Sequence, residues 1–561
     1  MKDGFKIHLF TSYALLLICF SCTDTVDQNA SKSVFRYNQS GGLTSLDPAF
    51  ASSQANIWVC TQLFDGLVEL DQDLKVRPAL AKKWEVSEDG TEYKFTIRKD
   101  VFFHEDKLFK SQDERLVTAY DFEYSLKRII DTNSIYNKGI WVFKDKVLRS
   151  TTGALSDTCF RAVNDSLFVI HLDHPVANFL EILAMPYAFV VPEKIAEHYG
   201  KDFRKHPVGT GAFKFFYWEE GNSLVLHKNE AFWKSGSNNV KLPFLDAVQL
   251  SFVPDKSQAY REFLMGELDY FSGIDQSSVD EVLNLDGSFN RSMLEKYSIQ
   301  KCGYLNTEYL GFQLDSNASC YRTNKEKPFL NKEFRKALSW SIDREKMVRF
   351  VKNNLGTPGL YGFVPPAVPN FDERKCLSYG VNKDSALFYL QKSGVSTDDI
   401  VLDIHITKEH RGLTEFIAKQ WEESIGVKVD IKIHEAGVLR QMANNGEVAC
   451  FRASWLGDYP DAENYLGVFY GSNFAPNGPN KTHFVNNEFD RCYEKLGDLR
   501  EKQARKDLTE HMDRLIMQEA PVLILYYDEV IQLTSKCILD LPINGMNVLK
   551  LDNVKKTCKS L

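Results

Sequence analysis

The segment from Phe451 to Asp461 carries side chains that could bind a small charged molecule. Its sequence, Phe-Arg-Ala-Ser-Trp-Leu-Gly-Asp-Tyr-Pro-Asp, places carboxylates, an arginine and aromatic rings close together. Asp458 stands between Gly457 and Tyr459, where backbone and ring could frame a cationic group. A carboxylate withdrawn from water needs such a partner. We therefore expect the rim of a site for a small zwitterion. The alternative is an ordinary turn in which Asp458 caps its own backbone.

A strand, a helix and a second strand are predicted shortly before this segment. Residues 402–406 alternate between apolar and polar, and the apolar side chains of 413–421 recur at helical spacing. Gly426 supplies a C-terminal stop, after which residues 427–433 alternate strictly, the pattern of a half-buried strand. Strand–helix–strand is the unit of an open α/β sheet, so we expect such a sheet in this half of the chain.

Other segments predict the same mixture of helices and strands. Thr118-Ala-Tyr-Asp121 resembles a capping box that opens a helix running through Arg128. Residues 384–393 form a second predicted helix, which a glycine ends. A long amphipathic helix over 501–517 precedes a buried strand at 521–525. The predicted class is α/β.

The amino terminus has the features of an export signal. Lys2 and Lys6 form a basic start, and the apolar stretch 9–20 is shorter than the roughly 18 to 20 residues that span a bilayer. Ser21 before Cys22 resembles a bacterial lipobox, although the two residues before Ser21 depart from the usual pattern. We expect a signal peptide over 1–21 and a lipidated tether over 22–33 that begins at Cys22. The alternative is an ordinary secretory signal with an incidental cysteine.

Length, charge and cysteine content limit the possible functions. A chain of 561 residues is too long for one core, which predicts two or three domains. The formal net charge of −8 gives no reason to expect nucleic acid or an anionic membrane surface as partner. The cysteines beyond Cys22 are scattered and odd in number, so we expect no disulfide framework or zinc site, and mostly small buried side chains. They are Cys60, Cys159, Cys302, Cys320, Cys376, Cys450, Cys492, Cys537 and Cys558.

Motifs of exported hydrolases and nucleotide-binding proteins are missing from the sequence. There is no Gly-x-Ser-x-Gly, no His-Glu-x-x-His and no Walker-type Gly-Lys-Ser/Thr. His405 and His410 are five apart, which misses the i, i+4 spacing of paired ligands on a helix. Asp458 and Asp461 could in principle do acid–base chemistry, so a hydrolase is kept as the alternative from another class. We expect no catalysis, no cofactor and no metal.

Short motifs, each different from the others, occur along the chain in a characteristic order. In that order they resemble the peptide- and oligopeptide-binding proteins of bacterial ABC importers (solute-binding family 5), over about 34–535. Within them, we expect Gly209 and Gly211 to permit a backbone geometry closed to other residues. The motifs are Ser45-Leu-Asp-Pro48, Leu63-Phe-Asp-Gly-Leu67, Pro78-Ala-Leu-Ala-Lys-Lys-Trp84, Tyr93-Lys-Phe-Thr-Ile-Arg98, Thr118-Ala-Tyr-Asp-Phe122, Pro207-Val-Gly-Thr-Gly-Ala-Phe213, Asn229-Glu-Ala-Phe-Trp233, Gly266-Glu-Leu-Asp269, Phe334-Arg-Lys-Ala-Leu338 and Ser341-Ile-Asp-Arg344.

The resemblance implies a two-lobed periplasmic-binding-protein fold of the large, three-domain type II group. Two segments cross between the lobes, which close on a ligand like a hinge. The implied divisions are lobe I over 34–64, 192–303 and 525–561, an extra domain on lobe I over 65–191, and lobe II over 304–524.

The same resemblance implies roles for individual residues. Asp458 stands where such proteins place the aspartate that pairs with a peptide's α-amino group, in an alignment fixed by Trp455. Arg452 matches a position that can reach a ligand carboxylate, and the backbones of Ser454 and Leu456 would supply strand hydrogen bonds.

Two tyrosines are further candidates, and two stretches depart from the family pattern. Tyr304 and Tyr309 fall on the first crossing segment, where they would line the cleft, the alternative being packing within the hinge. Residues 104–115 form a longer charged loop that we expect to be exposed. Residues 49–54, expected opposite Asp458, lack the acidic residue of some oligopeptide binders, so ligand length and side-chain preference stay open.

The function implied is a lipid-anchored receptor of the bacterial cell envelope that faces the periplasm or the outer surface. It would be a monomer that captures peptides and delivers them to the permease subunits of an ABC importer. The same fold could instead bind a metal chelate, haem, an oligosaccharide or a signalling peptide.

Overall fold

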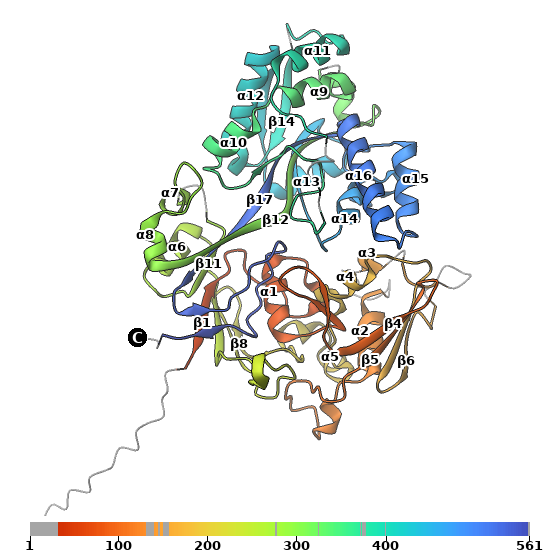
Figure 1. Cartoon of the computed structure of the whole chain (residues 1–561), viewed down its shortest axis with the longest axis vertical. Coiled ribbons are helices and arrows are strands. Elements are labelled where there is room, and N and C mark those ends of the chain that lie inside the picture. The colour runs from red at the N-terminus through yellow and green to blue at the C-terminus, as the bar shows by residue number, and fades with distance from the viewer. Residues whose placement is uncertain are drawn as a thin grey trace, which may run out of the picture.

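The computed structural model describes most of the chain as two lobes (Figure 1). The described residues are 32–130, 140–143, 146–149, 156–274, 278–323, 325–370, 372, 377–398 and 400–558. The expected signal peptide over 1–21 and Cys22 lie outside them, as does Cys376. In this described part, no helix has both the length and the apolar character needed to cross a membrane.

One eleven-stranded sheet runs through both lobes, and its strand order is β15-β14-β16-β12-β17-β11-β1-β10-β9-β8, with β13 paired to β17. Lobe I, at the bottom of Figure 1, holds the elements from β1 to α8 (Arg291–Lys296), and lobe II holds those from α9 (Lys332–Trp340) to α16 (Lys502–Glu519). The strands are β1 Val34–Asn38, β8 Phe213–Glu219, β9 Ser223–Lys228, β10 Ala247–Ser251, β11 Tyr270–Ser272, β12 Tyr297–Phe312, β13 Thr357–Pro358, β14 Val401–Ile406, β15 Lys428–Ile433, β16 Cys450–Leu456 and β17 Val522–Ser535.

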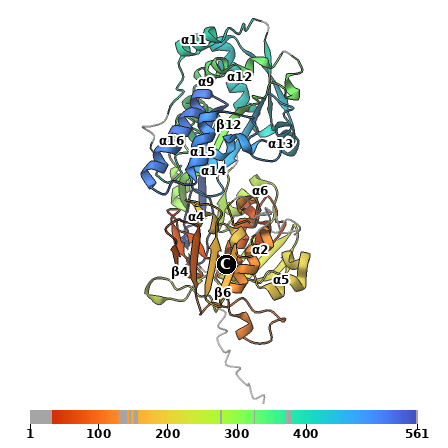
Figure 2. The ribbon, with the colours of Figure 1, turned by 90° about the vertical axis from the view of Figure 1, so that its right-hand side faces the viewer.

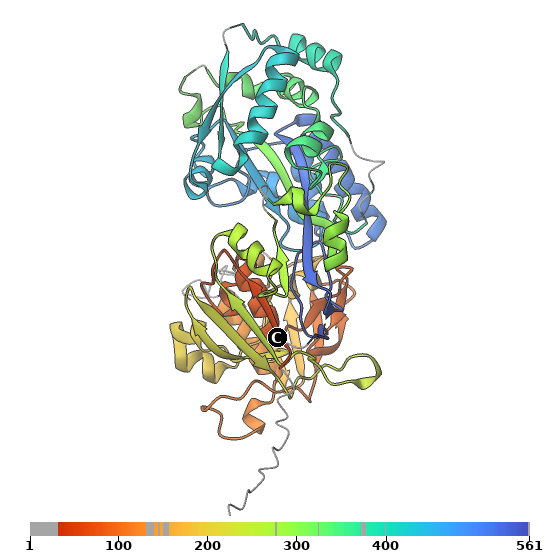
Figure 3. The ribbon, with the colours of Figure 1, turned by 90° about the vertical axis from the view of Figure 1, so that its left-hand side faces the viewer.

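Strands β12 and β17 are the two segments that cross between the lobes. They pair antiparallel along their length, and β17 returns the chain to lobe I (Figure 3). The pairing shifts register between Gly303 and Thr307 and again between Glu308 and Tyr309. Irregular pairing bends a strand and interrupts the ladder locally. The pairing between β12 and β17 is therefore irregular where the two strands cross between the lobes.

Lobe I carries a second sheet and a helix, α2, whose start the capping box predicted. The strand order of this second sheet is β4-β5-β7-β6, with β4 Ala81–Val86, β5 Glu92–Ile97, β7 Leu167–His171 and β6 Phe160–Asn164. Helix α2 (Ala119–Ile130) follows Thr118, whose N–H donates to Asp121 Oδ2 at 2.8 Å. This bond is the reciprocal half of a capping box, so the predicted helix start is confirmed.

Lobe II contains the predicted strand–helix–strand unit. Strands β14 and β15 pair in parallel and are joined by α12 (Arg411–Ile425). Gly426 ends α12 in the left-handed region at a φ of 73°, which glycine adopts without steric cost. Helices α11 (Lys383–Ser393) and α16 (Lys502–Glu519) are also as predicted, and β17 begins as a buried strand. The α/β class and the two-lobed fold are confirmed.

Gly209 and Gly211 are required for a reason that differs from the expected one. Neither has a positive φ; instead, a Cβ at either position would clash with the carbonyl oxygens of Leu63 and Gln62. His104 packs on the same turn, with its Nε2 3.0 Å from the carbonyl oxygen of Gly211. It is only 3% exposed, so the expectation of an exposed loop is wrong at its first residue. Burial lowers the pKa of His104 to about 4, which keeps the ring neutral.

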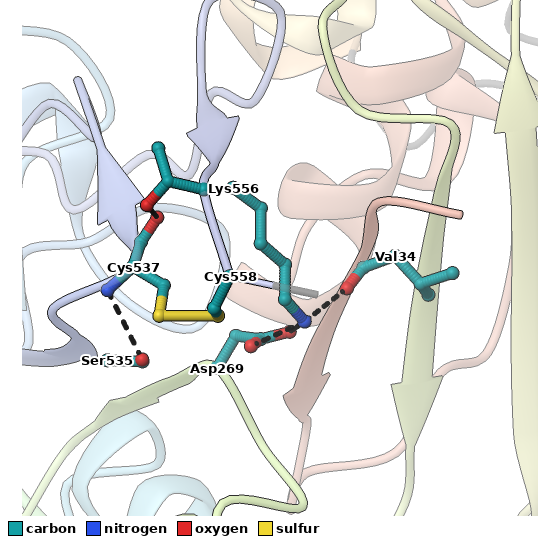
Figure 4. The surroundings of a disulfide bond; sticks show 7 residues. Val34, Asp269, Ser535, Cys537, Lys556 and Cys558 are labelled. Carbon is teal, nitrogen blue, oxygen red and sulfur yellow. Dashed lines mark hydrogen bonds and ion pairs between the residues drawn. A yellow bond between two sulfur atoms is a disulfide. The ribbon is translucent and has the colours of Figure 1, made fainter. Parts of the chain in front are cut away.

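A disulfide joins Cys537 to Cys558, a pairing that the scattered cysteines did not indicate (Figure 4). Beside it, Lys556 Nζ lies 2.8 Å from a carboxylate oxygen of Asp269 and 2.9 Å from the carbonyl oxygen of Val34. The bond closes a C-terminal loop onto lobe I. Six described cysteines have free thiols: Cys60, Cys159 and Cys450 are buried, whereas Cys302, Cys320 and Cys492 are partly exposed.

Candidate functional site

A cavity of about 760 Å³ lies where the two lobes meet. Lobe II lines the cavity with Leu456, the last residue of β16, and with Gly457 and Asp458, which follow it. The crossing strand β12 contributes Tyr304. The cavity volume falls in the range of roughly 300 to 1,000 Å³ typical of small-molecule sites. The lining from lobe I includes Ala51, Ser52, Gln54, Trp58, Met185 and Tyr187, and the C-terminal loop adds Asn544, Met546 and Asn547.

Asn464 holds Asp458 in place from helix α14 (Ala462–Leu466). Its Oδ1 accepts the backbone N–H of Asp458 at 3.1 Å, and its Nδ2 donates to Asp458 Oδ2 at 3.3 Å. The same Oδ1 accepts the indole N–H of Trp455 at 3.0 Å. A buried amide with three such bonds has little freedom to rotate. Asn464, which sequence reasoning missed, therefore fixes both Asp458 and Trp455.

The carboxylate of Asp458 has no cationic partner among the described residues. Burial raises its pKa from 3.8 to about 6, and the hydrogen bond from Asn464 offsets this only in part. Across the cavity, burial and then the charge of Asp458 raise the pKa of Tyr187 to about 12. A positively charged group placed beside this buried carboxylate would stabilise its ionised form.

Arg452 is already engaged by another carboxylate. It forms an ion pair with Glu308, which is 3% exposed and lies on β12. Asn306 Nδ2 donates to Glu308 Oε1 at 2.8 Å and to Asp528 Oδ2 at 2.7 Å, so two acids share one amide. The pKa of Glu308 is raised above its usual range, because burial and the charge of Asp528 raise it more than the charge of Arg452 lowers it. Arg452 does not line the cavity beside Asp458.

The remaining expected residues divide into two groups. Tyr304 and Leu456 line the cavity with Asp458, whereas Trp455 and Ser454 do not. Tyr309 is 2% exposed and packs edge-on against Phe363, with ring centroids 5.2 Å apart. Its position corresponds to the alternative of packing within the hinge.

Strand β16 keeps a free edge beside the site. It pairs with β12 from Cys450 to Leu456, whereas β14 reaches it only at Phe451. Among the described strand pairings, the stretch from Arg452 to Leu456 therefore has one edge without a partner strand. Unpaired N–H and C=O groups on such an edge can accept an added strand.

The C-terminal loop forms a wall of the cavity far from Asp458 in sequence. The indole N–H of Trp58 on α1 (Gln54–Leu63) donates to the carbonyl oxygen of Asn547 at 2.5 Å. Gln62 on the same helix donates to the carbonyl oxygen of Leu549 at 2.7 Å. No local pattern in the sequence marks this loop as part of a site, because its contacts span hundreds of residues.

A charged network lies further along the cavity wall. Lys234 pairs with Glu69 at 2.7 Å and with Asp552 at 3.2 Å, and Lys550 also pairs with Glu69. All four side chains line the cavity and all are paired within it. This end is therefore polar but internally compensated, in contrast to Asp458.

A second cavity of about 610 Å³ adjoins the first, and both are lined by Asp73, Leu74 and Glu181. The space between the lobes therefore continues past Glu181 toward α16. In the described part of the chain, no three His, Cys, Asp or Glu side chains gather in a way that could hold a metal ion.

Comparisons with known proteins identify relatives along nearly the whole chain. A model of bacterial extracellular solute-binding proteins (family 5, middle) matches residues 75–477. Oligopeptide-binding protein OppA of Bacillus subtilis (strain 168) is 29% identical over 506 residues, covering 86% of this chain and 85% of its own. Heme-binding protein A of Haemophilus influenzae is 26% identical over 530 residues, covering 89% and 88%. The solved structure of the ABC transporter-associated periplasmic binding protein DppA of Helicobacter pylori, in complex with peptide STSA, has a TM-score of 0.75 at 21% identity, covers 94% of this chain and 98% of its own, and supports the fold alone.

Proposed function

Because this chain belongs to the bacterial extracellular solute-binding proteins of family 5, we propose that it captures peptides between its lobes and delivers them to an ABC import permease. The relatives include an oligopeptide-binding protein of Bacillus subtilis that matches most of the chain. Family membership alone leaves the ligand open, since related folds serve different solutes. The chemistry of the cavity must therefore support the choice of peptide.

The observation that carries the proposal is the carboxylate of Asp458, which faces the cavity without a cationic partner among the described residues. A peptide's α-ammonium group would supply the missing charge, and Asn464 holds the carboxylate ready to receive it. A charge-assisted hydrogen bond in a site withdrawn from water is stronger than a surface ion pair. The binding energy would thus come from a group that every unmodified peptide has.

The free edge of β16 supports an extended ligand. From Arg452 to Leu456 the strand could pair with a peptide backbone, with Ser454 and Leu456 supplying main-chain hydrogen bonds. Backbone pairing ignores side-chain identity, so one site could accept many sequences. Arg452 would contribute to the ligand carboxylate only by sharing its charge with Glu308, which makes its role secondary.

A non-peptide solute is the second candidate, because one relative is a heme-binding protein. Asp458 favours a ligand with an ammonium group over a porphyrin or a sugar, since neither brings a positive charge to pair with the carboxylate. We do not assign catalysis to this site, whose family consists of binding proteins.

The remaining parts of the proposal concern the chain outside the cavity. We propose that Cys22 carries a lipid that tethers a monomer to the cell envelope, facing the periplasm or the outer surface. We also propose the division into lobe I (34–64, 192–303 and 525–561), its extra domain (65–191) and lobe II (304–524).

Two measurements test the proposal. Native mass spectrometry of protein purified without denaturation should detect co-purified peptide; a porphyrin or sugar in its place would refute the ligand class. Calorimetry with the alanine homopeptides from dialanine to pentaalanine should give binding that Asp458→Ala weakens at least tenfold. The matched control is Asp430→Asn, an exposed carboxylate of lobe II that pairs with Lys432. Equal affinities for wild type and Asp458→Ala would remove Asp458 from the site.

A further inference from the structure

Helix α14 presents two neighbouring side chains to two different partners. Asn464 holds Asp458 and Trp455 on the ligand side, as described above. Glu463, one residue earlier, contacts the opposite lobe: Asn178 Nδ2 donates to Glu463 Oε2 at 3.0 Å. The two residues are adjacent on one short helix, so α14 connects Asp458 to the contact with lobe I.

Glu463 is the acceptor at the centre of a cluster of donors. The hydroxyl group of Tyr459 donates to its Oε2 at 2.5 Å, and that of Tyr493 donates to its Oε1. Both tyrosines belong to lobe II, whereas Asn178 and Lys146 belong to lobe I. Burial alone would raise the pKa of Glu463, but the charge of Lys146 and the hydrogen bonds from Tyr459, Tyr493 and Asn178 outweigh it and lower the pKa.

The bond from Asn178 exists only while the lobes are together. Asn178 is 4% exposed at the start of α4 (Phe179–Leu183), and α4 faces α14 across the boundary of the lobes (Figures 1 and 2). Opening the cleft would separate the pair and return both groups to water, whereas the tyrosine bonds would remain. A contact made in one of two states shifts the equilibrium toward that state by its own free energy.

A second contact between the lobes is of a weaker kind. Arg500 donates to the backbone carbonyl oxygen of Glu88 in lobe I, and both partners are exposed. Solvent and salt screen such a surface contact, so it contributes little to the balance between open and closed states. The partly buried carboxylate of Glu463 is the stronger of the two.

We propose that the Glu463–Asn178 contact determines how tightly the lobes stay closed on a ligand, and that α14 couples it to occupation of Asp458. Glu463 is thus an affinity-determining residue that does not touch the ligand. The proposal rests on the proposed function, because it treats closure around a peptide as the binding event. Its effect falls on ligand release, since the contact must break before the cleft opens.

The test is the dissociation rate of whichever alanine homopeptide, from dialanine to pentaalanine, binds most tightly, measured by stopped flow. Asn178→Ala removes the bond, and Asn178→Asp places a second carboxylate against Glu463. We expect dissociation to accelerate about tenfold in the first variant and further in the second, because hydrogen bonds to charged groups carry energies of this order. The association rate should change little in either variant, whereas a purely structural loss would alter both rates.

The chain offers a chemically matched control within one lobe. Asn222 donates to Glu219 Oε2 at 2.6 Å on the β8–β9 hairpin of lobe I. Asn222→Asp creates the same juxtaposition of acids without involving the cleft, so release should not change. Unchanged release in both Asn178 variants would overturn the proposal. If wild type binds no peptide, the proposed function fails. Small-angle scattering then tests the contact by itself: Asn178→Asp must have a larger radius of gyration than Asn222→Asp.

Discussion

Peptide affinity should fall as the pH drops through the pKa of Asp458. Burial raises that pKa to about 6, and a bound ammonium group would lower it again. Only the ionised carboxylate pairs with the ammonium group, so binding must first remove a proton at low pH. At pH 5 about one site in eleven is ionised, which makes the apparent affinity roughly tenfold weaker than at pH 7. Above about pH 8 the peptide's α-amino group loses its own proton and affinity should fall again.

Calorimetry of trialanine binding between pH 4.5 and 9.5 measures this profile directly. In Asp458→Asn the acid limb should disappear, and affinity at pH 7 should be about 10- to 100-fold lower, as expected for the loss of a charge-assisted bond. Glu181 is the sharpest control, because it lines the same cavity and burial also raises its pKa. Glu181→Gln should keep the acid limb. No histidine is among the described cavity-lining residues to produce a similar midpoint.

Two results would refute this reasoning. A flat wild-type profile from pH 5 to 7 would mean that Asp458 does not receive a positive charge from the ligand. An acid limb with the same midpoint in Asp458→Asn would assign the titration to another group. Calorimetry in buffers of different ionisation enthalpy adds an independent check, since wild type should release close to one proton per peptide bound at pH 5.

Three further predictions concern stability. Cys537→Ser removes a disulfide that closes a loop with a sequence separation of 21, which should cost about 3 kcal/mol in the chain-entropy model and increase hydrogen exchange in the cavity wall; unchanged exchange would contradict it. Arg452→Met leaves Glu308 buried without its cation and should destabilise lobe II by about 3 to 5 kcal/mol in urea titrations, and adding Glu308→Gln should recover most of the loss. Gly211→Ala places a methyl group against the Gln62 backbone and should cost at least about 1 to 3 kcal/mol by thermal unfolding, whereas wild-type stability would show that the turn can move.

Local elements followed from the sequence because their causes are local. The capping residues Thr118 and Asp121 start α2, and Gly426 ends α12, as single side chains and a single φ angle dictate. Residues 427–433 alternate strictly, and they form β15. Motif order added the two-lobed fold, which the described structure confirms. The glycine turn at 209–211 was recognised, but its physical reason was close approach rather than φ.

The site itself was recognised only in part. Asp458 and Leu456 line the cavity with Tyr304, as their place in the motif order implied. Arg452 was the weaker expectation, because nothing near it in sequence announced that Glu308, on another strand, would take up its charge. The disulfide between Cys537 and Cys558 was likewise hidden, since cysteine counts carry no information on distance in space.

The sequence by itself determined the class of the fold, the order of its elements and the candidate segment, residues 451–461, from which Asp458 lines the cavity. Those properties depend on periodicity, caps and motif order, which are written along the chain. Tertiary structure decided which charged side chains pair with one another and which have no described partner. Glu308 neutralises Arg452 and Asn464 orients Asp458, whereas no described cation reaches that carboxylate. Pairing depends on distances between strands and lobes, and only the folded chain sets those distances.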